Sequence, residues 1–331
     1  MKMRNIAANV MTILIVLGIV LVGVLGFARE QVVADGPAVE PIRYSVARGA
    51  RFDAVAKDLT EAGAIDNLML FRLAGRYSGK ASQLKFGEYE IAPGSSMQDI
   101  LDLLAKGGNV NYTVTVPPGM TVSIAVERIN ALEPLTGEIV ELPPEGSLFP
   151  DTWAYQRGGS KQAVIDRMQA RMTEVLDEVW ETRAEDNPLE SKEQLLILAS
   201  IIEKETTPKE HRKVASVFVN RLNKGMRLQT DPTVIYGITL GQRSLGRGLR
   251  RSELNAKTPY NTYIIQGLPP TPIANPSRES LEAAANPDKT PYLYFVADGT
   301  GGHAFAESLE DHNRNVAVWR KIERERKAKE Q

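Results

Sequence analysis

The hydrophobic pattern begins with an uncharged run near the N-terminus. No charged residue occurs between Asn5 and Ala28, and most of this stretch is Ile, Leu, Val and Gly. At about 1.5 Å of rise per residue, a helix of this length can cross a hydrocarbon core of roughly 30 Å. Two basic residues precede the run and several acidic residues follow it, so the positive-inside rule predicts a cytoplasmic N-terminus. We therefore predict a cytoplasmic stub and a retained single-pass helix over residues 1–28, with a cleaved signal peptide as the alternative.

After a linker predicted at residues 29–41, the pattern gives a strand, a glycine turn and an amphipathic helix three times in succession. These three units cover residues 42–65, 86–104 and 112–130. They predict a small α+β domain over residues 42–140. The first two units together resemble a LysM-like fold, a common peptidoglycan-binding module, and a purely structural spacer is the alternative.

The C-terminal part of the chain has longer helical patterns. Apolar residues recur at spacings of three and four over residues 160–184. A capping box at Ser191 predicts a second helix over residues 192–207, and a third follows over residues 210–224. The fold class expected for the whole chain is α+β, with a transmembrane helix, the small domain and then a mixed α/β domain over residues 141–331.

Two glutamates stand at the end of the helix predicted over residues 192–207. Glu203 and Glu205 both fall inside its broad apolar arc, whereas Lys204 points the other way. A carboxylate on an apolar face is costly to ionise and can hold a proton near neutral pH, as a general acid for acetal cleavage must. The alternative is a glutamate that simply turns to solvent. The helical pattern nominates two carboxylates and does not choose between them.

The segment from Met226 to Asp231 alternates apolar with polar residues and predicts an extended strand that Pro232 ends. Its polar side chains, among them Gln229 and Asp231, would share one face, either lining a cleft or facing water. The final third is rich in Pro, Asn and Tyr, which suits loops that bind sugars by stacking and amide hydrogen bonds. A strand over residues 292–296 and a glycine turn over residues 299–302 predict a hairpin, and a charged helical tail follows.

Composition excludes several classes of site. The 331 residues carry a net charge of -1, so there is no basic excess to suggest a nucleic-acid partner. There is no cysteine, which rules out disulfides, thiol nucleophiles and thiolate metal sites. The chain has only three histidines and no H-E-x-x-H motif, which argues against a zinc hydrolase. No phosphate-binding loop or nucleophile elbow occurs. We predict that the protein uses no metal and no cofactor.

Longer motifs carry a resemblance to a known family. The chain resembles the endolytic murein transglycosylases of the YceG-like (MltG) family over nearly its whole length, although Ser277 stands where the pattern leads us to expect Gly. The matching segments are Glu145–Trp153, Leu198–Thr206, Val214–Leu222, Gly225–Gly237, Tyr260–Tyr263, Gly267–Pro270, Pro291–Val296, Gly301–His303 and His312–Asn313.

The resemblance implies that the first glutamate of the I-I-E-K-E-T motif, Glu203, is catalytic. One glutamate would suffice, because the C6 hydroxyl of the sugar itself attacks C1 and no water has to be activated. The resemblance also nominates a set of substrate-binding residues: Gln229, Asp231, Tyr236, Asn261, Tyr263 and Glu145.

The function implied is that of an inner-membrane lyase with a periplasmic catalytic part, which would cut nascent glycan strands internally. It would leave 1,6-anhydro-N-acetylmuramyl ends and terminate strand elongation near peptidoglycan synthases. One alternative is a lysozyme-like hydrolase, which would need a second carboxylate such as Asp231 or Glu145. The other is a non-catalytic anchor that binds the wall through the LysM-like part alone.

Overall fold

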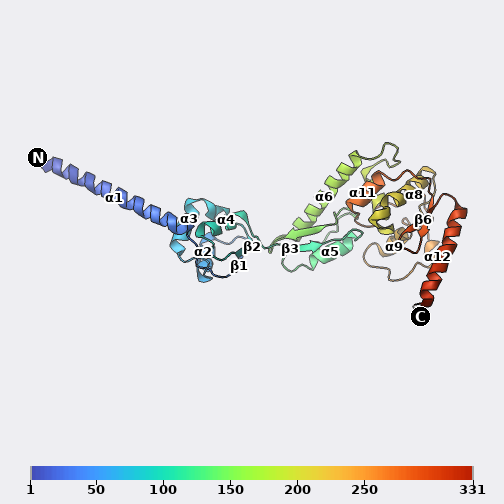
Figure 1. The fold of residues 1–331 in the computed structure, drawn as a ribbon, viewed down its shortest axis with the longest axis horizontal. Coiled ribbons are helices and arrows are strands. Elements are labelled where there is room, and N and C mark those ends of the chain that lie inside the picture. The colour runs from blue at the N-terminus through green and yellow to red at the C-terminus, as the bar shows by residue number, and fades with distance from the viewer. Residues whose placement is uncertain (1, 330–331) are drawn as a thin grey trace. The chain divides into compact units, whose positions relative to one another are not determined.

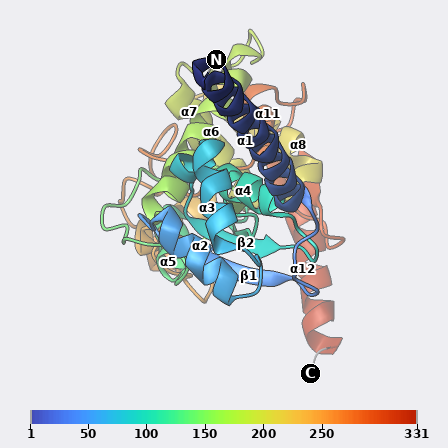
Figure 2. The same ribbon diagram turned by 90° about the vertical axis from the view of Figure 1, so that its left-hand side faces the viewer.

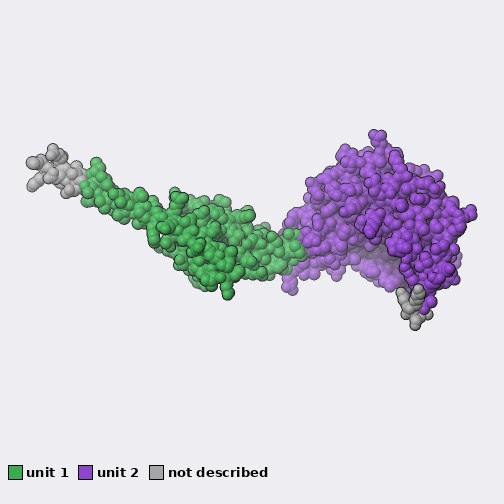
Figure 3. Space-filling view, in the orientation of Figure 1, with its two compact units in different colours: residues 1–113, 134–136, 154–159 green, residues 114–133, 137–153, 160–331 purple. Residues whose placement is uncertain are grey.

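The computed structural model describes residues 2–329, and it divides into two compact units (Figures 1 and 3). The first unit holds residues 1–113, 134–136 and 154–159, and the second holds the rest of the chain. Each unit has its own hydrophobic core. The fold is a mixed α/β fold, as expected, with one apolar helix at the N-terminus.

That apolar helix, α1 (Lys2–Val33), confirms the predicted pattern and extends it. Its segment Met11–Val33 is long and apolar enough to cross a membrane, and its mean hydropathy is 2.8. The helix continues five residues beyond the predicted end at Ala28, into the stretch expected to be linker. The reason is tertiary packing, because Val32 packs against the core of the first unit. The linker is therefore shorter than predicted.

In the first unit, strands β1 (Ile42–Val46) and β2 (Gly87–Ile91) form an antiparallel pair in which Ile42 faces Ile91. Helices α2 (Phe52–Glu61) and α3 (Leu68–Tyr77) and the 3-10 turn η1 (Lys80–Gln83) lie between the strands in sequence. Helix α4 (Met97–Lys106) follows, and Figure 2 shows α3 and α4 beside each other. The sequence analysis missed α3. The unit's largest buried side chains include Leu59, Phe71, Tyr89, Ile91, Ile100 and Leu104.

The third predicted strand–turn–helix unit is present as β3 (Tyr112–Thr115) and α5 (Val122–Asn130). Strand β3 pairs with β4 (Thr152–Tyr155). Residues 114–133, which contain α5, belong to the second compact unit, although the sequence pattern grouped them with residues 42–140. The functional boundaries predicted at residues 42–140 and 141–331 stay a prediction.

The second unit is built around α7 (Lys192–Glu205), whose middle is fully buried and packs against α6, α8 and α11. The predicted helices over residues 160–184, 192–207 and 210–224 are confirmed within a few residues, and so is the C-terminal hairpin. The other elements of this unit are α6 (Lys161–Glu181), η2 (Pro208–Glu210), α8 (His211–Asn223), α9 (Asp231–Thr239), α10 (Arg251–Leu254), α11 (Arg278–Ala285), β5 (Tyr294–Ala297), β6 (His303–Ala306) and α12 (Leu309–Lys329).

The strand predicted over residues 226–231 is wrong. Residues 226–230 form an irregular loop, and Asp231 and Pro232 begin helix α9, where a proline in the first turn costs no hydrogen bond. Gln229 has a φ of 52°, so the backbone turns left-handed and the side chains of this segment do not alternate as in a strand. A distant segment of the chain stabilises this loop, because the Gln229 amide donates to the Thr262 carbonyl at 3.1 Å.

Candidate active site

The C-terminal end of α7 presents its two glutamates to different surroundings. The helix starts at Ser191, whose hydroxyl accepts from the Gln194 amide, and it ends at Glu205. Residues i and i+2 of an α-helix are separated by about 200° around the helix axis, so the side chains of Glu203 and Glu205 leave the helix in nearly opposite directions. Each therefore joins a separate polar cluster.

Glu203 is bound to the start of α11. Its Oε2 accepts from the Ser277 amide at 2.9 Å, from the Ser277 hydroxyl at 2.5 Å and from the Ser280 hydroxyl at 2.7 Å. Ser277 is the N-cap of α11, so the carboxylate lies where a helix N-terminus favours a negative charge. These three bonds tie α7 to α11.

The buried imidazole of His211 extends this network. Its Nδ1 lies 3.2 Å from the Ser280 hydroxyl and its Nε2 lies 3.2 Å from the Thr206 carbonyl. A carbonyl only accepts, so Nε2 carries a proton. Glu203, itself partly exposed, thus belongs to a network that joins α7, α8 and α11, and its contacts are those of a residue that holds helices together.

Glu205 has the properties expected of a proton donor. Burial raises the pKa of its carboxyl group, and the negative charge of Asp231 raises it further. The Thr230 hydroxyl donates to Oε1 and opposes this shift. The side chain is nonetheless partly exposed. A carboxyl group that is destabilised as an anion but can reach solvent is suited to general acid catalysis.

Polar side chains from three other elements surround Glu205. The Tyr263 hydroxyl donates to Asp231 Oδ1 at 2.7 Å, and burial raises the pKa of that phenol, so it stays a hydrogen-bond donor. His303, at the start of β6, lies near enough to act on Glu205 electrostatically, and its Nδ1 lies 2.7 Å from Glu210 Oε2. We call Glu205, Thr230, Asp231, Tyr263 and His303 the Glu205 cluster.

The loop that carries Gln229 into this region is fixed by a buried arginine. Arg221 Nε donates to the Leu293 carbonyl at 2.7 Å and one terminal nitrogen donates to the Leu228 carbonyl at 2.7 Å. The Gln229 side-chain oxygen lies 3.5 Å from that nitrogen. These contacts hold Gln229 in its left-handed conformation, an arrangement that is usually strained for a residue other than glycine.

Glu145 and Tyr236 form a second pair. Glu145 accepts from the Val122 amide at 2.9 Å, at the start of α5, and from the Tyr236 hydroxyl at 3.2 Å. Burial raises the pKa of Glu145 as well. Tyr236 also stacks edge-on against Tyr260, with ring centroids 5.0 Å apart.

A cleft of about 720 Å³ runs beside α9. Its apolar lining comes mainly from the 117–121 segment, Ile124, Ile235 and Tyr236, and its cationic groups include Lys204 and Arg243. We call this the α9 cleft. Its size is that of a typical small-molecule site.

Asn261 has a structural role. It is fully buried, and its amide nitrogen donates to three carbonyls of residues 253–256, the shortest of these bonds being 2.7 Å long. Its Oδ1 accepts from the Tyr263 amide at 3.0 Å, so the residue positions Tyr263. A buried side chain with all these bonds made does not reach a ligand.

The structure therefore groups the nominated residues differently from the sequence. Asp231, Tyr263 and the adjacent Gln229 lie with Glu205 and not with Glu203, whereas Glu145 and Tyr236 form their own pair. No local sequence signal marks Thr230, Arg221 or His303 as site residues, because tertiary packing brings them to α7. Among residues 2–329, no three His, Asp or Glu side chains gather so as to hold a metal ion.

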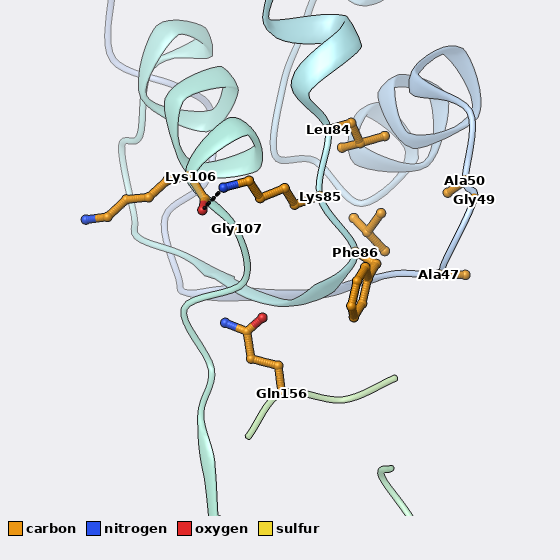
Figure 4. A pocket seen from close by; sticks show the side chains of 10 residues that line it. Ala47, Gly49, Ala50, Leu84, Lys85, Phe86, Lys106, Gly107 and Gln156 are labelled. Atoms are coloured by element: carbon orange, nitrogen blue, oxygen red, sulfur yellow. Dashed lines mark hydrogen bonds between the residues drawn. The ribbon is translucent and has the colours of Figure 1, made fainter. Parts of the chain in front are cut away.

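The first unit has a separate cavity of about 480 Å³ (Figure 4). It lies between the turn after β1 and the segment before β2, and its lining includes Leu84, Phe86 and Gln156. Lys85 also lines it and donates to the Lys106 carbonyl at 3.1 Å. An aromatic ring beside amide and ammonium groups is a lining that suits a polar ligand with an apolar face.

Comparison with known proteins identifies the family to which this chain belongs. The YceG-like family matches residues 44–318, and the chain belongs to that family. A solved structure of a YceG-like protein from Listeria monocytogenes shares 30% identity and a TM-score of 0.52, covering 84% of this chain and 99% of that one.

Two relatives carry a functional name. The endolytic murein transglycosylase of Bacillus subtilis strain 168 is 32% identical, covering 82% of this chain and 83% of the relative. The endolytic murein transglycosylase of Streptococcus pneumoniae strain D39 is 30% identical over 86% of this chain. The chain spans only 59% of the length of that pneumococcal relative.

Proposed function

We propose that this chain is a membrane-anchored peptidoglycan lytic transglycosylase that cuts glycan strands internally. The names of the relatives support the substrate and the reaction class. The observation that carries the chemistry is the position of Glu205, a partly exposed carboxyl group that accepts from the Thr230 hydroxyl and lies beside Asp231, in the motif Glu-Lys-Glu-Thr. Cleavage would leave 1,6-anhydro-N-acetylmuramyl ends and terminate the growing strand.

Glu205 acts as the acid and then as the base in this proposal. Its proton passes to the glycosidic oxygen as the bond from that oxygen to C1 breaks and positive charge develops at C1. The C6 hydroxyl of the same sugar then attacks C1, and its proton returns to the Glu205 carboxylate. No water is consumed, so a single carboxyl group completes the cycle.

The neighbours of Glu205 supply binding and electrostatics. The Asp231 carboxylate, which accepts from the Tyr263 phenol, would stabilise positive charge at the reacting sugar. Gln229, whose side-chain oxygen lies 3.5 Å from Arg221, would bind the substrate beside them. Asn261 serves by positioning Tyr263, as its buried hydrogen bonds indicate.

The α9 cleft would hold a neighbouring part of the glycan strand. Tyr236 and Ile235 provide an apolar wall on which a sugar ring can stack, and Glu145 orients the Tyr236 phenol. Lys204 and Arg243 give the cleft a positive character that suits the carboxylates on muramyl substituents. The strand would then contact both the α9 cleft and the Glu205 cluster.

This assignment departs from the one implied by resemblance, which makes Glu203 catalytic. The test compares full-length Glu205→Gln with Glu203→Gln on purified sacculi, at matched circular dichroism. We expect Glu205→Gln to lose about 10²–10⁴-fold in rate, because glutamine keeps the shape but cannot donate a proton. Glu203→Gln keeps an acceptor for the serines and should retain most activity. The opposite ranking would return the catalytic role to Glu203.

The first unit supports a proposal of its own. Its order of strand, two helices and strand is compatible with a LysM-like module, and the cavity at Phe86 is a candidate glycan contact.

We propose an inner-membrane location with the N-terminus in the cytoplasm and the second unit in the periplasm, near peptidoglycan synthases. A variant with residues 1–28 replaced by a cleavable signal should still cut sacculi, and a folded but inactive product would contradict a separable anchor.

A lysozyme-like hydrolase is the alternative that the geometry supports best. The charge of Asp231 acts on Glu205, so a second carboxylate is available to activate water. The products separate the two, since hydrolysis adds water and leaves a reducing end. A purely wall-binding protein would give no product at all.

A further inference from the structure

The strongest unexplained surface is an apolar stripe on α3. Met69, Leu73 and Tyr77 recur every four residues and lie on one face of this helix. They are 81%, 63% and 94% exposed, although large apolar side chains are usually buried. We call these three residues the α3 stripe. A contiguous exposed stripe of this kind marks an interaction surface.

The α3 stripe adjoins the apolar helix α1. A groove of about 620 Å³ lies between the two helices, lined by Leu25 and Val32 from α1 and by Leu73 and Tyr77 from α3. Apolar side chains of α1 and α3 therefore line one groove, to which Arg29, Lys80 and Gln98 also contribute. The α1 side of this surface is itself exposed, as expected for a helix that faces lipid.

The level of the groove along α1 places it at the edge of a bilayer. The uncharged run of α1 ends at Ala28, where Arg29 and Glu30 follow, so the hydrocarbon core should end close to this point. The groove meets α1 from Leu25 onward, which is its last 12 Å or so. This part of the helix would lie where acyl chains give way to headgroups. Tyrosine favours that zone, and Tyr77 lines the groove. Arg29 also lines it, and its long side chain can extend toward the headgroups.

The connection from α1 to the rest of the first unit is short and bound. The Gly36 amide donates to the Gly94 carbonyl at 3.1 Å, and the Gly94 amide donates back to the Ala38 carbonyl at 2.8 Å. Gly36 packs directly on the Ser95 carbonyl, so there is no space for a Cβ. Val32 enters the unit's core. A membrane that holds α1 is thereby brought to the α3 stripe.

We propose that the α3 stripe is a membrane-docking surface, inserted among phospholipid headgroups and upper acyl chains beside α1. The occupant is bilayer lipid, because the stripe continues the lipid-facing surface of α1 and lies at the level of the interface. The first unit is then seated on the membrane and does not swing on a tether. This inference rests on α1 spanning the bilayer, and it is independent of the catalytic assignment.

The absence of cysteine in the chain makes a direct test possible. Single variants Met69→Cys, Leu73→Cys and Tyr77→Cys are labelled with an environment-sensitive fluorophore, in full-length protein in phosphatidylcholine nanodiscs. Leu21→Cys on α1 is the lipid-exposed control, and Ser45→Cys on β1 is the aqueous control. All five side chains are exposed, so labelling removes no core packing. Quenching is measured with a lipid-borne nitroxide and with aqueous iodide.

We expect the three stripe labels to lose fluorescence to the lipid-borne nitroxide, as the Leu21 label does, and to resist iodide. The Ser45 label should show the reverse. Stripe labels that iodide reaches as readily as it reaches the Ser45 label would overturn the proposal. Labels shielded from both quenchers would also overturn it, since another protein surface would then cover the stripe.

Discussion

Replacing Glu203 by alanine should destabilise the second unit strongly. The change removes the acceptor for the Ser277 amide, the Ser277 hydroxyl and the Ser280 hydroxyl, all of which are nearly inaccessible to water. A buried donor left without a partner costs about 1–3 kcal/mol. The serine hydroxyls can rotate to other acceptors, so we estimate a total loss of about 2–5 kcal/mol in the free energy of unfolding.

The chain allows this loss to be measured in the second unit alone. Its three tryptophans, Trp153, Trp180 and Trp319, all belong to that unit. Urea unfolding of the full-length protein in detergent, followed by tryptophan fluorescence, therefore reports on the region around Glu203.

Glu205→Ala is the matched control. It also removes a carboxylate from α7, but that carboxylate is destabilised by burial, so losing it should cost much less. A Glu203→Ala variant as stable as the wild type would refute the structural role, most clearly if it were also inactive.

Three further predictions follow from named contacts. Burial raises the pKa of Glu205 above its ordinary value of 4.5, so the stabilisation from its protonated form is present below pH 4.5 and is lost as pH rises through the folded-state pKa. In urea titrations, the free energy of unfolding of the wild type should therefore fall relative to that of Glu205→Gln as pH rises above 4.5. Gln229→Val should be less stable than Gln229→Gly by about 1–2 kcal/mol, because a φ of 52° is costly for a β-branched residue, and equal unfolding midpoints would count against this strain. Gly36→Ala should abolish hydrogen-exchange protection of the backbone amides at positions 36 and 94, and unchanged protection would show that the connection tolerates a Cβ.

The sequence predicted the helices of the second unit well, because their periodicity and caps are local signals. Ser191 caps α7 as expected, and the apolar positions of that helix are buried. The alternation at residues 226–231 misled, because Pro232 is as compatible with the first turn of a helix as with the end of a strand. Helix α3 was missed because part of its apolar surface faces away from the core.

The site could be predicted only in part. Periodicity put both Glu203 and Glu205 within the apolar arc of α7 and could not separate them. The contacts that distinguish the two glutamates are long-range. Ser277 and Ser280, which bind Glu203, lie more than seventy positions beyond it in the sequence, and Thr230, which binds Glu205, lies in the loop before α9. The family resemblance is confirmed, but the surroundings of each carboxyl group had to come from the fold.

The end groups of digested sacculi test the central claim most directly. Full-length wild-type protein is incubated with purified sacculi, and the soluble muropeptides are analysed by mass spectrometry. The account predicts 1,6-anhydro-N-acetylmuramyl ends, each lighter by one water than a reducing end, and their near absence with Glu205→Gln. Reducing ends as the main product would contradict the transglycosylase mechanism, and undiminished anhydro ends from Glu205→Gln would contradict the role of Glu205.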